Sequence, residues 1–170
     1  RGHHGQMVPL HLMSKKYINC ITLRYYIKEM IKMITYGLRT DNGKLYKYEF
    51  DESIPKDFEE LNFKASDGKS LNGLLFKADN TKGLVFYLHG NAGSLSSWGN
   101  VANTYTDLNY DVFILDYRSF GKSEGSISNQ EQLFEDNQLI YDELKEKYRE
   151  DDIIILGYSI GTGLASKLAS

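Results

Sequence analysis

The sequence has little of several features that would place a chain in a special class of protein. It contains one cysteine, Cys20, so no internal disulfide can form, and a reducing compartment fits this composition. Its net charge of −3 is too small to suggest a nucleic-acid-binding surface. It has no internal repeat and no low-complexity linker. With 41% hydrophobic and 25% charged residues over 170 positions, it has the composition of one globular domain.

Charge is unevenly distributed along the chain. Residues 1–40 hold seven Lys or Arg and one acidic residue, Glu29, whereas residues 41–170 hold 13 basic and 22 acidic residues. Such asymmetry is typical of an added segment. We therefore expect residues 1–44 to form a basic N-terminal segment and residues 45–170 to form the domain.

The basic segment contains no uncharged apolar run long enough to span a membrane. Residues 17–36 include four charges, whereas a spanning helix needs about 20 mostly apolar residues. Apolar side chains recur at helical spacing on one face, at Leu23, Ile27, Met30, Ile31 and Ile34. Basic side chains recur on another face, at Arg24, Lys28 and Lys32. This pattern predicts an amphipathic helix that packs on the domain, is ordered only in a longer protein, or binds weakly to an anionic membrane surface. We expect a cytoplasmic protein, with membrane association as the alternative.

The first residues carry no periodic pattern. We expect residues 1–6 to be unstructured. His3 and His4 are neighbours, but no further ligand-type residue lies near them, so the sequence predicts no metal site.

The start of the domain has the pattern of a β-hairpin. Residues 58–65 alternate apolar and polar side chains, and residues 71–77 resume an extended pattern. Between them, Asp67 and Gly68 form a tight-turn signal. These segments predict two antiparallel strands.

Three continuous apolar runs follow, at residues 84–88, 112–115 and 153–156. Short runs of this kind are typical of strands buried on both faces of a parallel sheet. Helix-length stretches separate them, at residues 95–109 and 129–148. The order predicts an α/β fold in which the hairpin precedes a mostly parallel sheet with flanking helices.

The second of these helices has a start signal of its own. Ser128 is followed three residues later by Glu131, which is the pattern of a capping box.

The last apolar run leads into a candidate catalytic motif. Residues 157–161 read Gly-Tyr-Ser-Ile-Gly and match G-x-S-x-G, in which a sharp strand-to-helix turn exposes the serine hydroxyl. The apolar strand before the motif and the helix-compatible residues after it strengthen this interpretation. Gly157 and Gly161 are needed where the chain folds back on itself. Ser159 is therefore the predicted nucleophile.

The run at 84–88 leads into the loop His89-Gly90-Asn91-Ala92-Gly93. A loop at this place supplies one backbone N–H of an oxyanion hole, and the residue after the nucleophile supplies the other. We assign these donors to Asn91 and Ile160, with Gly90 and Gly93 as loop glycines. His89 precedes Ser159 by 70 residues, whereas this architecture orders its triad as serine, acid, histidine. A structural role for His89 is therefore favoured.

The run at 112–115 leads into residues 116–125, Asp-Tyr-Arg-Ser-Phe-Gly-Lys-Ser-Glu-Gly. Asp116 also precedes the nucleophile, so it is not expected to be the triad acid. We expect Asp116 and Arg118 to brace the loops.

Taken together, residues 89–93, 116–125 and 157–161 resemble the α/β-hydrolase superfamily, in its branch related to serine aminopeptidases and prolyl-oligopeptidase-like hydrolases. The resemblance covers about residues 45–170, the N-terminal portion of such a domain. One departure is Ser119, where the family commonly has glycine. The larger one is that the 11 residues after Ser159 contain no Asp, Glu or His. The resemblance implies that the triad acid and histidine come from later strands, so that this chain is truncated after the elbow.

The resemblance implies a serine hydrolase that cleaves an ester, thioester or amide through an acyl-enzyme, without a cofactor. Its partner would be a small-molecule or peptide acyl substrate. A non-catalytic relative or an inactive fragment is the alternative. A dinucleotide-binding domain is disfavoured because residues 161–166 imitate G-x-G-x-x-G but end in Ser166 and follow two buried strands.

Overall fold

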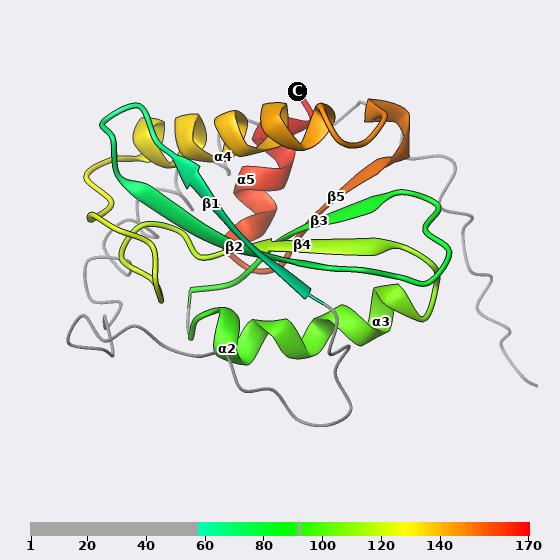
Figure 1. Cartoon of the computed structure of the whole chain (residues 1–170). Coiled ribbons are helices and arrows are strands. Elements are labelled where there is room, and N and C mark those ends of the chain that lie inside the picture. Colours follow the sequence, from blue (N-terminus) through cyan, green and yellow to red (C-terminus); the bar gives the residue numbers. More distant parts are fainter. Residues whose placement is uncertain (1–57, 92) are drawn as a thin grey trace, which may run out of the picture.

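The computed structural model describes residues 58–91 and 93–170. This part of the chain forms one mixed sheet between two layers of helices (Figure 1). The strand order across the sheet is β1-β2-β4-β3-β5. The strands are β1 (Phe58–Lys64), β2 (Ser70–Phe76), β3 (Leu84–Leu88), β4 (Asp111–Leu115) and β5 (Ile153–Gly157). The predicted α/β class is confirmed.

The predicted hairpin is present. β1 pairs antiparallel with β2 in register from Phe58 opposite Phe76 to Lys64 opposite Ser70. The N–H of Gly68 donates to the carbonyl of Ala65 at 2.8 Å, and Gly68 has a φ of +80° that suits glycine. β2 then pairs antiparallel with β4, while β4, β3 and β5 run parallel.

Helices cover both faces of the sheet. One face carries α2 (Leu95–Trp98), the 3₁₀ turn η2 (Gly99–Val101) and α3 (Ala102–Thr106), so the predicted helix at 95–109 is divided into short pieces. The other face carries α4 (Gln130–Lys145) and α5 (Gly161–Leu168), and η3 (Glu150–Asp152) precedes β5. Figure 1 shows α2 and α3 below the sheet, and α4 and α5 above it.

The start of α4 differs by one residue from the prediction. Asn129, not Ser128, is the N-cap, and its Oδ1 accepts from the N–H of Gln132 at 2.8 Å. Gln132 reaches back, because its Oε1 accepts from the N–H of Ser128 at 2.9 Å. The reciprocal pair of bonds therefore uses a glutamine, and Glu131 does not take part in it.

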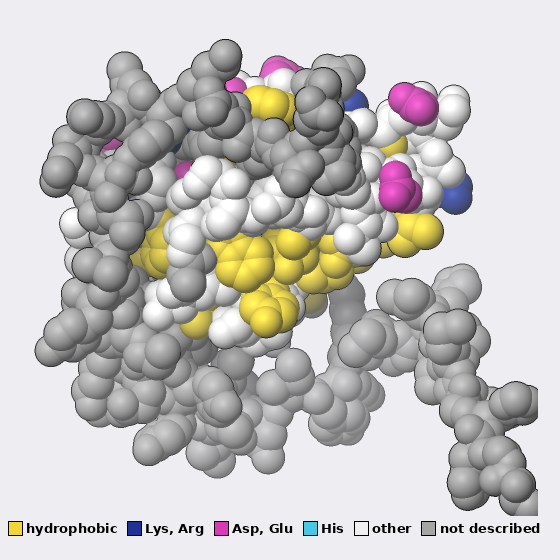
Figure 2. All heavy atoms as spheres, turned by 90° about the horizontal axis from the view of Figure 1, so that it is seen from below, with side chains coloured by type: hydrophobic (Ala, Val, Ile, Leu, Met, Phe, Trp, Pro, Cys, Tyr) yellow, Lys and Arg dark blue, Asp and Glu magenta, His cyan; other side chains and the backbone are white. Residues whose placement is uncertain are grey.

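The central strands β3 and β4 are more buried than the last strand, β5. Every residue of β3 and β4 is buried, as their apolar runs predicted. β5 is an edge strand of the described sheet, and its residues are mostly half-buried rather than buried on both faces. Ile154 is 39% exposed. Figure 2 shows hydrophobic side chains gathered on the face of the molecule that is seen from below. The apolar run therefore identified the strand correctly, and within the described residues only one side of β5 has a partner strand.

The predicted basic segment, its helix at 17–36 and the boundary near residue 45 lie outside the described residues. In the part that the structure describes, no helix is both long and apolar enough to cross a membrane.

Candidate active site

The three motif-bearing loops lie at the carboxyl ends of the parallel strands. β3, β4 and β5 are parallel, so the loops that follow them leave the sheet on the same side. Leu88 pairs with Gly157 in the last register position of β3 and β5. The loop that begins at His89 therefore starts beside the turn that holds Ser159. Ligands in open α/β sheets bind at this edge, at the carboxyl ends of the strands.

The turn after β5 has the geometry of a nucleophile elbow. Ser159 has a φ of +53°, a left-handed conformation that is strained for a residue with a side chain. The N–H of Tyr158 donates to the Leu88 carbonyl at 2.9 Å, and the N–H of Thr162 donates to the Ser159 carbonyl at 3.1 Å. These bonds hold the turn at both ends. Ser159 itself is exposed to solvent.

The two glycines of the motif allow close backbone approach. A Cβ atom at Gly157 would collide with the carbonyl of Gly161. A Cβ atom at Gly161 would collide with the carbonyl of Leu88 on the neighbouring strand. This turn therefore requires glycine at both positions.

The loop after β3 lies against the elbow. A Cβ atom at Gly90 would lie 3.5 Å from the Cβ of Ser159, so these two residues are in contact range. Among the described residues, the N–H groups of Asn91 and Ile160 have no acceptor. An oxyanion hole is built from backbone N–H groups that have no other acceptor. Gly93 has a φ of +77°, a conformation that favours glycine.

His89 is enclosed rather than presented to the site. It is fully buried, and its Nδ1 lies 2.7 Å from the carbonyl oxygen of Gly90. Its ring stacks on Trp98, with centroids 5.5 Å apart, and lies 4.3 Å from the ring of Tyr117. Burial lowers the pKa of His89 to about 4, so the ring is neutral at pH 7. Its contacts are those of a structural histidine.

The loop after β4 is tied to the helix that follows β3. Asp116 is fully buried, and its Oδ1 accepts from the N–H of Leu95, the first residue of α2, at 2.9 Å. Its Oδ2 accepts from the N–H of Lys122 at 3.3 Å. Asp116 therefore fixes the loops after β3 and β4 relative to each other.

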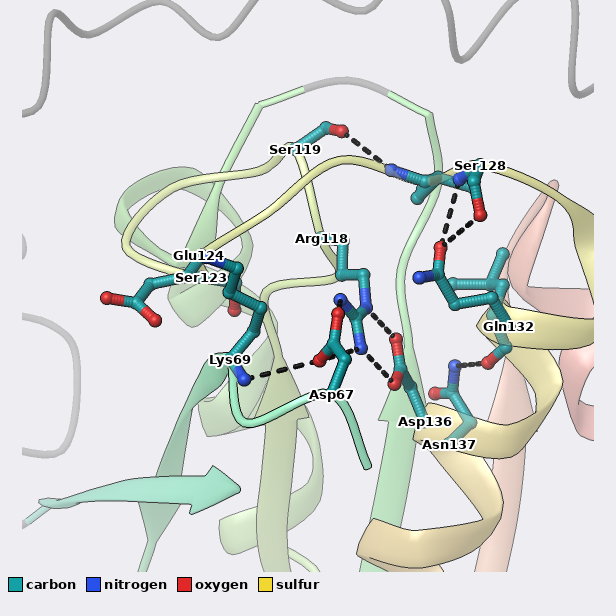
Figure 3. Close-up of polar contacts among 12 residues, drawn as sticks. Asp67, Lys69, Arg118, Ser119, Ser123, Glu124, Ser128, Gln132, Asp136 and Asn137 are labelled. Atoms are coloured by element: carbon teal, nitrogen blue, oxygen red, sulfur yellow. Dashed lines mark hydrogen bonds and ion pairs between the residues drawn. The ribbon is translucent and has the colours of Figure 1, made fainter. Parts of the chain in front are cut away.

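Arg118 extends this bracing to the hairpin and to α4. Figure 3 shows its guanidinium between Asp67 and Asp136. It binds Asp136 through Nε and Nη2 at 2.5 and 2.9 Å, and Asp67 through Nη1 and Nη2 at 2.6 and 3.0 Å. The bond from Arg118 lowers the pKa of Asp67 to about 2. Sequence reasoning assigned the bracing role to Arg118 but named neither carboxylate partner, because no local spacing links the three positions.

Sequence reasoning also missed the aromatic side chains beside the elbow. Trp98 and Tyr158 lie with ring centroids 5.6 Å apart, and both approach Gly90.

The described residues contain no cluster of His, Cys, Asp or Glu that could hold a metal ion.

Comparison with known proteins places this arrangement in a family. The family described as "Serine aminopeptidase, S33" matches residues 79–170, which include all three loops. The chain belongs to this family of α/β-hydrolases. The S33-family chain is 32% identical over 114 residues to the uncharacterized protein YfhR of Salmonella typhimurium, covering 63% of this chain and 39% of that protein. It is 36% identical over 87 residues to the lysophosphatidylserine lipase ABHD12 of Danio rerio, covering 50% of this chain and 22% of the lipase. The chain thus spans about two fifths or less of the length of these relatives.

Solved structures show the same fold. An α/β-hydrolase from Vibrio vulnificus superposes with a TM-score of 0.63 at 20% identity, over 90% of this chain and 53% of that protein. An esterase from Pyrococcus furiosus superposes with a TM-score of 0.55 at 22% identity, over 74% of this chain and 50% of the esterase. At these identities the likeness concerns the fold alone.

Proposed function

We propose that this S33-family chain carries the nucleophile and oxyanion hole of a serine hydrolase that cleaves an ester, thioester or amide through an acyl-enzyme. The observation that carries the proposal is the conformation of Ser159. Its left-handed backbone is held between two glycines and the Leu88 carbonyl, and its side chain is exposed. Strain of this kind persists where the surrounding structure enforces it, and it is common at catalytic residues.

In the proposed reaction, the Ser159 oxygen attacks the carbonyl carbon of the substrate and loses its proton to a base. The backbone N–H groups of Asn91 and Ile160 donate to the oxygen that becomes negative. Collapse of this intermediate breaks the bond to the alcohol, thiol or amine, which takes up the proton, and leaves an acyl group on Ser159. Water then releases the acid by the same route.

The base is not assigned to His89. Its ring is enclosed by aromatic side chains, and its Nδ1 is engaged with the Gly90 carbonyl. The proposed base and its acid partner lie in sequence outside these 170 residues. This assignment is supported by the relatives, of which the chain matches only part.

A fluorophosphonate probe, which reacts with activated serines, tests the proposal. The 170-residue chain is compared with an extended protein that includes the sequence following Ser170 in the gene. Only the extended protein is expected to be labelled, and mass spectrometry should place the label on Ser159. Ser159→Ala should abolish labelling and lower kcat on a short acyl ester by roughly 10⁶, whereas Ser166→Ala in α5 is the matched control.

Two outcomes would contradict the proposal. Retention of most esterase activity by Ser159→Ala would remove Ser159 as nucleophile. Equal labelling of the 170-residue chain would place a base within it, and His89 would then be the first residue to substitute.

A further inference from the structure

Two aromatic side chains stand beside the nucleophile. A Cβ atom at Gly90 would lie 3.2 Å from Tyr158 Cδ1, 3.4 Å from Trp98 Cζ2 and 3.5 Å from Ser159 Cβ. The two rings and the serine therefore converge on one glycine. The rings are tilted by 55° with centroids 5.6 Å apart, so they form one continuous wall.

Within these 170 residues, the outer end of this wall is open to solvent. Tyr158 is 57% exposed, whereas the residue on the other side of Ser159, Ile160, is 7% exposed and packs in the core. The elbow thus directs Ile160 inward and leaves Tyr158 outside. An exposed tyrosine ring beside an exposed serine offers apolar surface to whatever binds there.

Trp98 is held in place from behind. Its ring stacks on His89 with an interplanar angle of 20°, and it packs against Tyr87 with centroids 6.3 Å apart. Burial keeps His89 neutral, so the stack presents no positive charge to the site at pH 7. A rigid aromatic surface binds a partner at low cost in conformational entropy.

We infer that Trp98 and Tyr158 form the wall of a subsite that binds the hydrocarbon chain of the substrate next to Ser159. The inference rests on the proposed function, because the reacting carbonyl must lie at Ser159 for the wall to contact an adjacent chain. Either half of an ester, the acyl chain or the alcohol chain, offers the required chemistry. The two residues are specificity determinants and take no part in proton transfer.

The single tryptophan of the sequence makes binding measurable without catalysis. Trp98 is the only tryptophan in the 170 residues, so its fluorescence reports on this wall alone. Titration of the chain with octanoate is expected to change the emission, whereas acetate, which has the same carboxylate, should need a concentration at least about tenfold higher. Equal responses to octanoate and acetate would overturn the inference.

Variants at Tyr158 locate the binding. Tyr158→Ala should weaken octanoate binding about tenfold, and Tyr158→Phe should retain it because the ring remains. Leu108→Ala is the control, since Leu108 is equally exposed, at 58%, but lies just after α3. Unchanged octanoate binding by a folded Tyr158→Ala chain would also overturn the inference. If that variant does not fold by circular dichroism, the comparison of octanoate with acetate in the unaltered chain decides.

Activity of the extended protein shows whether the hydrocarbon chain at the wall belongs to the acyl half or to the alcohol half of the ester. Methyl octanoate and octyl acetate are each compared with methyl acetate, in the unaltered protein and in Tyr158→Ala. The preference that falls about tenfold in the variant identifies which half of the ester contacts the wall. If Tyr158→Ala keeps both preferences, a role of this residue in specificity is contradicted.

Failure of the subsite and failure of the proposed function give different results. Octanoate binding needs no reaction, so it should survive Ser159→Ala. If octanoate binds but no fluorophosphonate label appears on the extended protein, the wall stands and the hydrolase proposal fails. If labelling occurs without octanoate binding, the wall alone is wrong.

Discussion

Arg118 and Asp136 form a buried, two-pronged ion pair, with Nε to Oδ2 at 2.5 Å and Nη2 to Oδ1 at 2.9 Å. The two side chains are only 2% and 5% exposed. Arg118 lies in the loop after β4 and Asp136 in α4, while the remaining donors of Arg118 reach Asp67 in the hairpin turn. One guanidinium therefore joins three elements that are distant in sequence. A buried pair of this kind is costly to break on one side only, because the remaining charge stays desolvated.

Arg118→Met should therefore strongly destabilise the fold. It leaves the carboxylate of Asp136 buried without its cation, and we expect the free energy of unfolding to fall by about 3–5 kcal/mol in urea titrations. Arg149→Met is the matched control, because Arg149 is 78% exposed and lies 3.7 Å from Asp151. The control should change stability by less than about 1 kcal/mol. Equal effects of the two substitutions would show that the buried network contributes little.

The burial of His89 should make the fold sensitive to acid. Its pKa is about 4 in the folded chain and about 6.5 when unfolded, so the unfolded state binds more protons between these values. His89 should therefore cost no stability above about pH 6.5 and progressively more as pH falls towards 4. His89→Phe should flatten this part of the profile, measured by urea unfolding at pH 7.5, 5.5 and 4.5. A stability difference between the two chains that is independent of pH would refute this assignment.

Ser119 combines strain with a compensating bond. Its φ of +70° is unfavourable for a residue with a Cβ, and its Oγ accepts from the N–H of Ile127 at 3.2 Å. Ser119→Ala keeps the strain and loses the bond, so we expect a loss of about 1 kcal/mol. Ser119→Gly loses the bond but relieves about 1 kcal/mol of strain, so its stability should stay close to that of the unaltered chain. Thermal or urea unfolding of both variants checks this order, and an alanine variant at least as stable as the glycine variant would contradict it.

Asn91 should act through its backbone. Its side-chain Oδ1 is buried with no partner among the described residues, and an amide oxygen accepts hydrogen bonds and cannot donate one to an oxyanion. Asn91→Ala in the extended protein should change the rate of fluorophosphonate labelling by less than about tenfold. Loss of a true side-chain donor costs about 10²–10³ in rate. A loss of that size, with circular dichroism unchanged, would assign the role to the side-chain amide.

Much of the fold was predictable because its signals are local. The Asp67-Gly68 turn, the apolar runs and the glycines of the elbow each depend on neighbouring residues, and the structure has a hairpin, parallel strands and a sharp turn at these places. The cap of α4 was misplaced by one residue because Ser128 and Asn129 are both good N-caps, and the position of Gln132 decides between them. The predicted helix at 95–109 became short pieces, which periodicity alone does not reveal.

By itself, the sequence determined the order of strands and helices along the chain, the family and the position of Ser159 after the last strand, because each follows from residue types at fixed spacing. Tertiary structure alone decided which distant groups meet. It placed Asp67 and Asp136 on Arg118, enclosed His89 among aromatic rings, and set Trp98 against Tyr158 over Gly90. These contacts depend on the order of the strands across the sheet and on how the helices pack. A linear pattern of residues carries no direct record of either.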